Sequence, residues 1–195
     1  MQSKVSQTKL DKLMVCMRRD IPNLRIAYKD EPMPTWWLGA LMMLVRLVGL
    51  IAPRLEEQWF TNYSNGIFNY LLLPSRSTHG DHLDVNVYAI LRHEYVHMRD
   101  MRRHPVWFPL SYLLVLPTVL TMRAHWELRG YTQQMLVEYE CTGDVSDHTL
   151  DWIAEKFTGA MYLWMWPFGN RVRSRLKDIR RGILKGEVQG FYPAV

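Results

Sequence analysis

Two histidines and a glutamate stand close together in the segment 91–98, which reads LRHEYVHM. If this segment is helical, His93 and His97 project from one face, because residues i and i+4 lie one turn apart. Two imidazoles placed in this way can bind one metal ion, and Glu94 can reach a water molecule beside that ion. The pattern therefore indicates metal-assisted hydrolysis, with zinc as the metal and Glu94 as the general base.

A zinc site that performs chemistry needs a third protein ligand and keeps a fourth position open for water or substrate. The preferred third ligand is Glu127, which lies in a second predicted helix within the segment RAHWELRGY at 123–131. Two histidines remain as alternatives, His104 and His125. Neither fits as well, since His125 is only two positions from Glu127 and faces another side of that helix.

Other side chains near these ligands can stabilise charge or orient the histidine rings. Tyr131 is one turn beyond Glu127 and is predicted to lie near the metal, where its hydroxyl can bind the oxyanion. The alternatives for this role are His125, His104 and Arg123. A carboxylate commonly fixes the orientation of a metal-bound imidazole. The candidates are Asp100, Glu138 and Asp84, and the sequence does not distinguish among them.

The site helix is predicted over 85–103, after a polar loop at 75–84, and its last turns carry basic residues as the helix dipole prefers. A short strand is expected at 24–28. Two more strands are expected within 58–73, around Asn65-Gly66, a dipeptide that favours tight hairpin turns. Further helices are predicted over 122–139, 147–166 and 170–185.

Three apolar segments, 36–52, 106–120 and 157–166, need an explanation. The first is nearly long enough to span a bilayer, but it contains Arg46, and a charge there is costly in lipid. A buried or partly buried core helix is therefore preferred for 36–52. The alternative is a helix that lies in a membrane or crosses it.

Composition narrows the class of protein. The chain has 195 residues, of which 48% are hydrophobic, so it can form a substantial core and global disorder is excluded. The formal charge of +5 is ascribed to solubility; no specific nucleic-acid partner is expected, and contact with an anionic membrane surface stays open. Cys16 and Cys141 are too few for a disulfide framework, and no signal peptide is recognised, so a cytoplasmic or intracellular location is expected.

The order of predicted hairpin, His93-Glu94-Tyr95-Val96-His97 helix and downstream glutamate helix resembles the zincin metallopeptidases, in particular the gluzincin branch. The likeness covers about residues 58–135. It implies zinc held by the two histidines and a downstream ligand, and an edge strand near 63–73 that binds an extended peptide. The related metzincin pattern does not fit, because Asp100 and Arg103 stand where it has glycine and histidine.

We therefore predict an α+β fold, a mainly helical zincin-like domain over 1–195 with a small antiparallel β-hairpin or sheet beside the active-site helix. An N-terminal arm at 1–22 and a basic C-terminal helix at 170–195 complete it. The predicted activity is that of a zinc metalloprotease acting on a peptide or protein. The alternatives are a non-catalytic zinc-stabilised module, or a membrane-associated protein with an incidental motif. The oligomeric state does not follow from the sequence.

Overall fold

A computed structural model describes residues 7–50, 53–61, 64–74, 85–113, 122–159 and 165–188. This part of the chain is mostly helical, with one small three-stranded sheet, as an α+β prediction requires. The helices are α1 (Gln7–Asp20), α2 (Trp36–Gly49), α3 (Pro53–Thr61), α4 (Val85–Arg103), α5 (Trp107–Leu113), α6 (Arg123–Thr142), α7 (Asp147–Thr158) and α8 (Gly169–Leu184).

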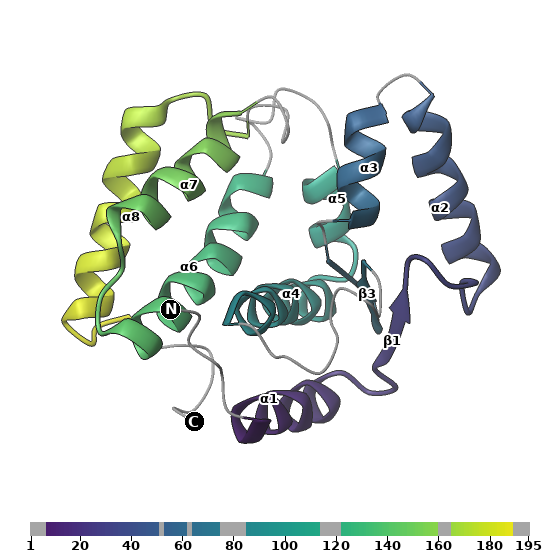
Figure 1. Cartoon of the computed structure of the whole chain (residues 1–195), viewed down its shortest axis with the longest axis horizontal. Helices are drawn as coiled ribbons and strands as arrows, with labels where there is room; N and C mark the ends of the chain where they lie inside the picture. Colours follow the sequence, from purple (N-terminus) through teal and green to yellow (C-terminus); the bar gives the residue numbers. More distant parts are fainter. Residues whose placement is uncertain are drawn as a thin grey trace.

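Two helices, α4 and α6, pack against each other at the centre (Figure 1). On one side of them lie α7 and α8, and on the other side lie the sheet and the α2–α3 pair, while α1 lies beneath α4 (Figure 1). The predicted bounds of α4 agree with those observed. The helix ends follow local chemistry: Gly143 closes α6 in a left-handed conformation with φ 80°, and the Ser146 hydroxyl caps α7 by accepting the Thr149 N–H.

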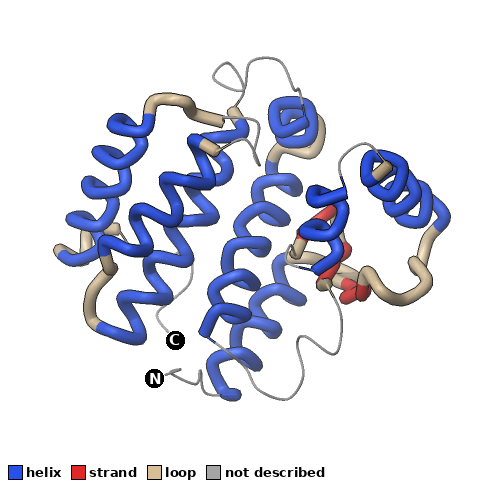
Figure 2. The backbone as a smooth tube through the Cα atoms, turned by 45° about the horizontal axis from the view of Figure 1, so that its top comes forward, coloured by secondary structure: helices blue, strands red, loops and turns tan. Residues whose placement is uncertain are grey.

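The sheet contains β1 (Arg25–Tyr28), β2 (Asn65–Ile67) and β3 (Tyr70–Leu73) in the order β1-β3-β2. Figure 2 shows the strands as one small patch between the central helices and the α2–α3 pair. The predicted antiparallel pairing holds for β2 and β3, but β1 runs parallel to β3. Because α2 and α3 lie between these two strands in sequence, the chain crosses over before β3 and can pair with β1 in parallel.

The predicted hairpin turn at Asn65-Gly66 is wrong. Both residues belong to β2, and the chain reverses at Phe68, which has a left-handed φ of 53°, and Asn69. Packing explains the shift, since a Cβ at Gly66 would lie 2.5 Å from Met98 Cγ on α4, so this glycine is needed for close approach. The start of the predicted first strand, from 58 to 61, belongs to α3.

The core has separate centres on the two sides of α4 and α6. One lies between α6, α7 and α8, around Met135 and Phe157, and another joins α1, β3 and α4. Leu13, Met17 and Ile21 belong to the second cluster, so the N-terminal segment contributes to the core instead of forming a loose arm.

The three apolar segments, 36–52, 106–120 and 157–166, form different structures where the structure describes them. Residues 36–49 form α2, which is buried along one side only. Residues 107–113 form α5, α7 ends at Thr158, and the remainder of both predicted segments lies largely outside the described residues. No helix in the described ranges combines the length and hydropathy that crossing a bilayer requires.

Candidate metal centre

The two central helices bring the three predicted ligands to one point. His93 and His97 on α4 place their Nε2 atoms 2.9 Å apart, and Glu127 on α6 places Oε2 3.3 Å from His93 Nε2 and 3.8 Å from His97 Nε2. All three residues are buried, with 3 to 7% of their surface exposed. Within the part of the chain that the structure describes, this is the one group of three metal-ligating side chains.

The spacing of these donor atoms fits a tetrahedral ion. Zinc bonds of about 2.0–2.1 Å at tetrahedral angles place neighbouring ligand atoms about 3.3 Å apart. The three observed separations lie around this value, from 2.9 to 3.8 Å. Two imidazoles and one carboxylate are also a donor set used for zinc sites that keep one position open. The three residues could therefore hold one metal ion.

Glu94 lies beside this group on α4 and is 9% exposed. The backbone N–H of Gly66 on β2 donates to Glu94 Oε2 at 2.6 Å. Burial raises the pKa of Glu94 to about 7, although His93 and the Gly66 N–H act in the opposite direction. The predicted base is therefore held in place by the edge of the sheet.

Two polar side chains that the sequence analysis did not single out contact the ligands. The amide nitrogen of Gln134, Nε2, lies 3.2 Å from His93 Nδ1, the ring nitrogen that does not face His97 and Glu127. The Tyr112 hydroxyl on α5 donates to Glu127 Oε1. Gln134 is two helical turns after Glu127, a spacing that could have identified it. Nothing in the apolar segment around Tyr112 indicated its role.

The charge on Glu127 is stabilised by its neighbours. Burial alone would raise the pKa of this carboxyl, but hydrogen bonds from His93 and His97 lower it well below its usual value. Burial and the negative charge of Glu127 raise the pKa of the Tyr112 phenol, so this group stays protonated and continues to donate. Glu127 therefore carries its charge into the site with one oxygen held by Tyr112 and the other facing the histidines.

Gly130, a third residue without a predicted role, lets α6 approach the histidines. A Cβ at this position would lie 2.6 Å from two atoms of the His93 ring, closer than any side chain tolerates. Glu127, Gly130, Tyr131 and Gln134 share one face of α6 by their spacing. A lone glycine inside a helical segment commonly has a packing reason, and that signal was available in the sequence.

Tyr131 packs its ring edge-to-face with His93, with 4.9 Å between the ring centroids. It also contacts the rings of Trp152 and Phe157 on α7 and is 3% exposed. The structure thus places Tyr131 next to a metal ligand, within the core cluster of α6, α7 and α8. Its role in binding an oxyanion stays a prediction.

The alternative ligands lie elsewhere. The rings of His104 and His125 pack near Trp126, and neither histidine belongs to the group around Glu127. The suggested orienting carboxylates are also engaged away from the histidines: Asp100 pairs with Arg129 at 2.8 Å, and Glu138 accepts the Ser146 N–H. Asp84 lies outside the described residues.

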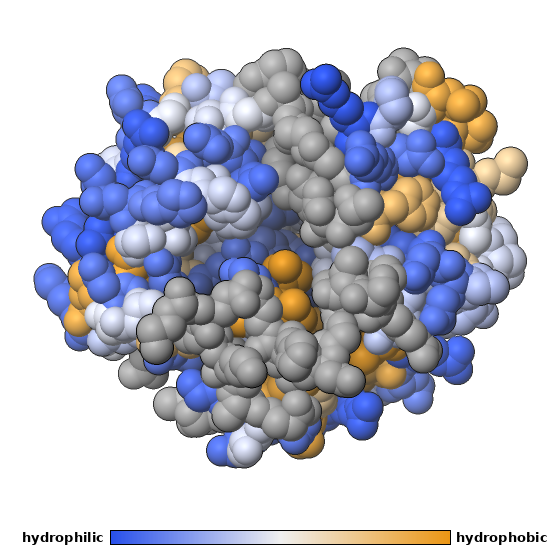
Figure 3. Space-filling model, viewed as in Figure 1, coloured by the Kyte–Doolittle hydropathy of each residue, from blue (hydrophilic) through white to orange (hydrophobic). Residues whose placement is uncertain are grey.

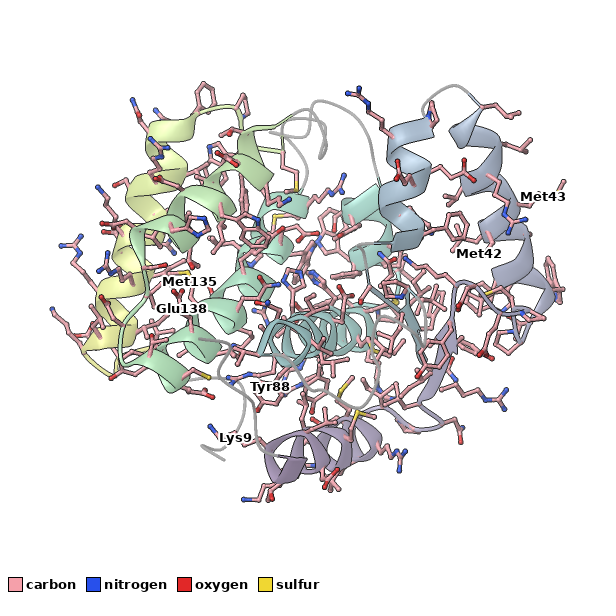
Figure 4. The ribbon with its side chains drawn as sticks, viewed as in Figure 1. Lys9, Met42, Met43, Tyr88, Met135 and Glu138 are labelled. Atoms are coloured by element: carbon pink, nitrogen blue, oxygen red, sulfur yellow. The ribbon has the colours of Figure 1, made fainter. Side chains whose placement is uncertain are left out.

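Two arginine contacts fix α4 against α6 on either side of the ligands. Arg129 on α6 donates two hydrogen bonds to the buried Asp100 on α4. Arg92 on α4 donates to Glu140 at 2.7 Å and to Gln133 at 3.0 Å on α6. Figure 4 shows Met135 and Glu138 on the side of α6 toward α7 and α8, so the polar contacts with α4 lie on another face. Bidentate pairs of this kind set geometry as well as energy.

Comparison with family models, with curated proteins and with solved structures found no match to this chain.

Proposed function

We propose that this protein is a zinc-dependent hydrolase that cleaves peptide bonds, as its resemblance to the gluzincins suggests. The observation that carries the proposal is the convergence of His93, His97 and Glu127 at separations that suit one tetrahedral ion. The general base required by this chemistry, Glu94, follows the first ligand on the same helix.

In this proposal His93, His97 and Glu127 hold zinc, with Gln134 and Tyr112 fixing the orientation of two of them. Zinc supplies Lewis acidity, which lowers the pKa of a coordinated water from 15.7 to about 7. Glu94 takes up the proton of the attacking water and passes it to the leaving amine. Glu94 therefore both accepts and returns a proton within one turnover, as general acid–base catalysis requires.

In this proposal the substrate binds along the edge of the sheet. β2 is an edge strand that packs against α4, and its Gly66 N–H points at the Glu94 carboxylate. An extended peptide that pairs with this edge would have its backbone beside the base. The likeness to zincins predicts this mode for residues 63–73. Tyr131, next to His93, remains the predicted donor to the oxyanion.

The test compares the zinc-loaded protein with Glu94→Gln and with Glu155→Gln, a matched change at an exposed position on α7. Each is incubated with a mixed peptide library, products are identified by mass spectrometry, and bound zinc is measured. We expect one zinc per chain in all three. Cleavage should fall by about 10²–10⁴-fold in Glu94→Gln alone, the usual contribution of a general base. Equal cleavage by Glu94→Gln and wild type would overturn the proposed mechanism.

A non-catalytic zinc-stabilised module is the second candidate, and the burial of the ligands favours it. Glu127, His97 and His93 are only 3, 5 and 7% exposed, as in structural sites closed to substrate. This candidate predicts one zinc per chain and a gain in stability on binding it, with no peptide cleavage by the wild type. The same measurements therefore decide between the two functions.

A further inference from the structure

The α2 helix is apolar on both sides although only one side is buried. Leu38 and Met42 face the protein and are 0 and 6% exposed, whereas Met43 is 65% exposed. Figure 4 shows Met43 on the outer side of α2 and Met42 on the side toward the rest of the molecule. Arg46 is the one charged residue of this helix. A helix that is apolar all round is normally covered on every side.

Four exposed apolar residues of α2, together with Leu50 just after its end, follow a regular pattern, which we call the α2 stripe: Trp36, Ala40, Met43, Leu47 and Leu50. Leu44, which is 58% exposed, lies beside the stripe on the same helix. The steps along the stripe are four, three, four and three residues, the spacing at which one helix meets another in a coiled coil. Trp36 and Leu50, at its ends, are 85 and 81% exposed. Figure 3 shows the resulting hydrophobic surface at the upper right, where α2 lies.

A groove runs along the stripe and widens the apolar surface. It has a volume of about 770 Å³ and is bordered by α2 and by the segment 29–35. Met33, Met42 and Met43 contribute to its lining, and a Cβ at Gly39 would meet no atom within 4 Å. Flexible methionine side chains adapt well to a partner surface. The stripe and the groove together form one continuous surface for another helix.

The charges around the stripe do not favour an anionic lipid surface. Exposed residues of both signs border it, namely Arg46 and Glu31, which line the groove with the stripe. The strongly basic helix α8 lies at the opposite end of the molecule (Figure 1), so it cannot reinforce membrane contact by α2. A membrane-surface helix usually carries basic residues along its polar border. The 4-3-4-3 spacing and the mixed charges favour a protein helix instead.

We propose that the α2 stripe binds the α2 stripe of a second copy of this chain, with the two helices antiparallel and centred on Met43. This arrangement sets the large Trp36 against Leu50 of the partner subunit, and it places the small Ala40 one position away from the partner's Leu47. Such a contact is self-complementary, as twofold symmetry requires.

The exposed apolar area along α2 is close to what a stable dimer interface buries. The exposed side chains of Trp36, Met43, Leu44, Leu47 and Leu50 amount to on the order of 700 Å² per chain, close to the roughly 800 Å² per partner of a standard interface. The surface is separate from the metal centre, and the inference does not depend on the proposed function.

The first experiment measures molar mass by light scattering at micromolar concentration for wild type, Leu47→Glu and Leu184→Glu. Leu47 and Leu184 are similarly exposed, at 50 and 44%, but Leu184 lies at the end of α8. We expect a dimer for wild type and Leu184→Glu, and a folded monomer by circular dichroism for Leu47→Glu. A monomeric wild type overturns the proposal, and its flotation with anionic vesicles would then assign the stripe to a membrane. A dimer that persists in Leu47→Glu also overturns it.

Disulfide trapping tests the orientation and does not rely on a destabilising charge. In a background that lacks both free cysteines, Cys16→Ser with Cys141→Ser, Met43→Cys should form a covalent dimer by itself, because the two copies of this residue face each other. Trp36→Cys and Leu50→Cys should each stay monomeric alone and form a covalent dimer when mixed. Cross-linking of Trp36→Cys or Leu50→Cys alone would instead show a parallel pair and overturn the antiparallel arrangement.

Discussion

The α4–α6 pair buries polar side chains, whereas the α2 helix exposes apolar ones, and neither arrangement favours the stability of the isolated chain. Between α4 and α6, imidazoles and carboxylates are buried among apolar side chains, and each contact is closely fitted. On α2, large apolar side chains face outward. Burying polar groups and exposing apolar ones both cost free energy. The comparison suggests that each region is completed from outside the chain, one by a metal ion and the other by a second copy.

Metal binding should give the largest effect, and it should be confined to the α4–α6 region. A ligand at about 1,000 times its Kd stabilises the folded state by about 4 kcal/mol. We expect a gain of this size when zinc is added to metal-free wild type, and no such gain in His97→Ala. The measurement is the free energy of unfolding in denaturant, with zinc or with a chelator.

His148→Ala provides the control, because His148 is exposed on α7. It should keep the full gain from zinc, and so should Leu47→Glu on α2. If His97→Ala gains as much stability from zinc as wild type does, the ion binds elsewhere. The claim that a metal ion completes the α4–α6 region would then be wrong.

One substitution, Gly→Ala, probes the packing of both regions. In helices alanine is more stable than glycine by roughly 0.5–1 kcal/mol, provided that the methyl group has room. Gly39→Ala on α2 meets open space and should stabilise the protein by that amount. Gly130→Ala on α6 meets the His93 ring and should destabilise the protein by about 1–3 kcal/mol, the usual cost of overpacking, and should weaken zinc binding. Equal effects of the two substitutions on the unfolding free energy would contradict the close approach of α6 to His93.

The sequence predicted one of these regions far better than the other. The bounds of α4 followed from helical spacing. The choice of Glu127 followed from the requirement of zinc for a third ligand and from the resemblance to the gluzincin arrangement. The roles of Gly130 and Tyr112 depend on how α5 and α6 meet α4. Such tertiary contacts leave little trace in local patterns, although the lone glycine was a signal.

The wrong prediction of a hairpin turn at Asn65-Gly66 also arises from a tertiary contact. A local preference for a turn was overridden because β2 must pack against α4, where only a glycine fits beside Met98. For α2, hydropathy indicated a helix that is apolar all round, but it could not show which side the core covers. The 4-3-4-3 stripe became recognisable as a surface feature only once the buried side was known.

Tyr112→Phe should weaken zinc binding by about 10–100-fold, the usual cost of removing a group that orients a metal ligand. The change deletes only the hydroxyl that donates to Glu127, and the ring can keep its stacking on Phe108. Competition with a chelator of known affinity measures the effect. Tyr139→Phe, at a partly buried position on α6, is the control and should bind zinc like wild type. Unchanged affinity in Tyr112→Phe would mean that Glu127 needs no support from α5.

Lys29 belongs to both regions, since it borders the groove beside α2 and also supports the strand next to Glu94. Its ammonium donates to Trp59 O and to Asn65 Oδ1, both at 2.7 Å. Burial lowers the pKa of Lys29 to about 7, from an ordinary value near 10.4.

The smallest expected effect is therefore a pH dependence. Between pH 7 and 10 the unfolded chain binds a proton at Lys29 that the folded chain has released, so this residue makes the unfolding free energy rise with pH. The slope is at most about 1.4 kcal/mol per pH unit for one proton. From pH 7.5 to 8.5, wild type and the exposed-site control Lys177→Met should gain about 1 kcal/mol more than Lys29→Met. Equal slopes for all three would mean that Lys29 keeps its proton in the fold. The ammonium that donates to Trp59 O and Asn65 Oδ1 would then persist beside the groove above neutral pH.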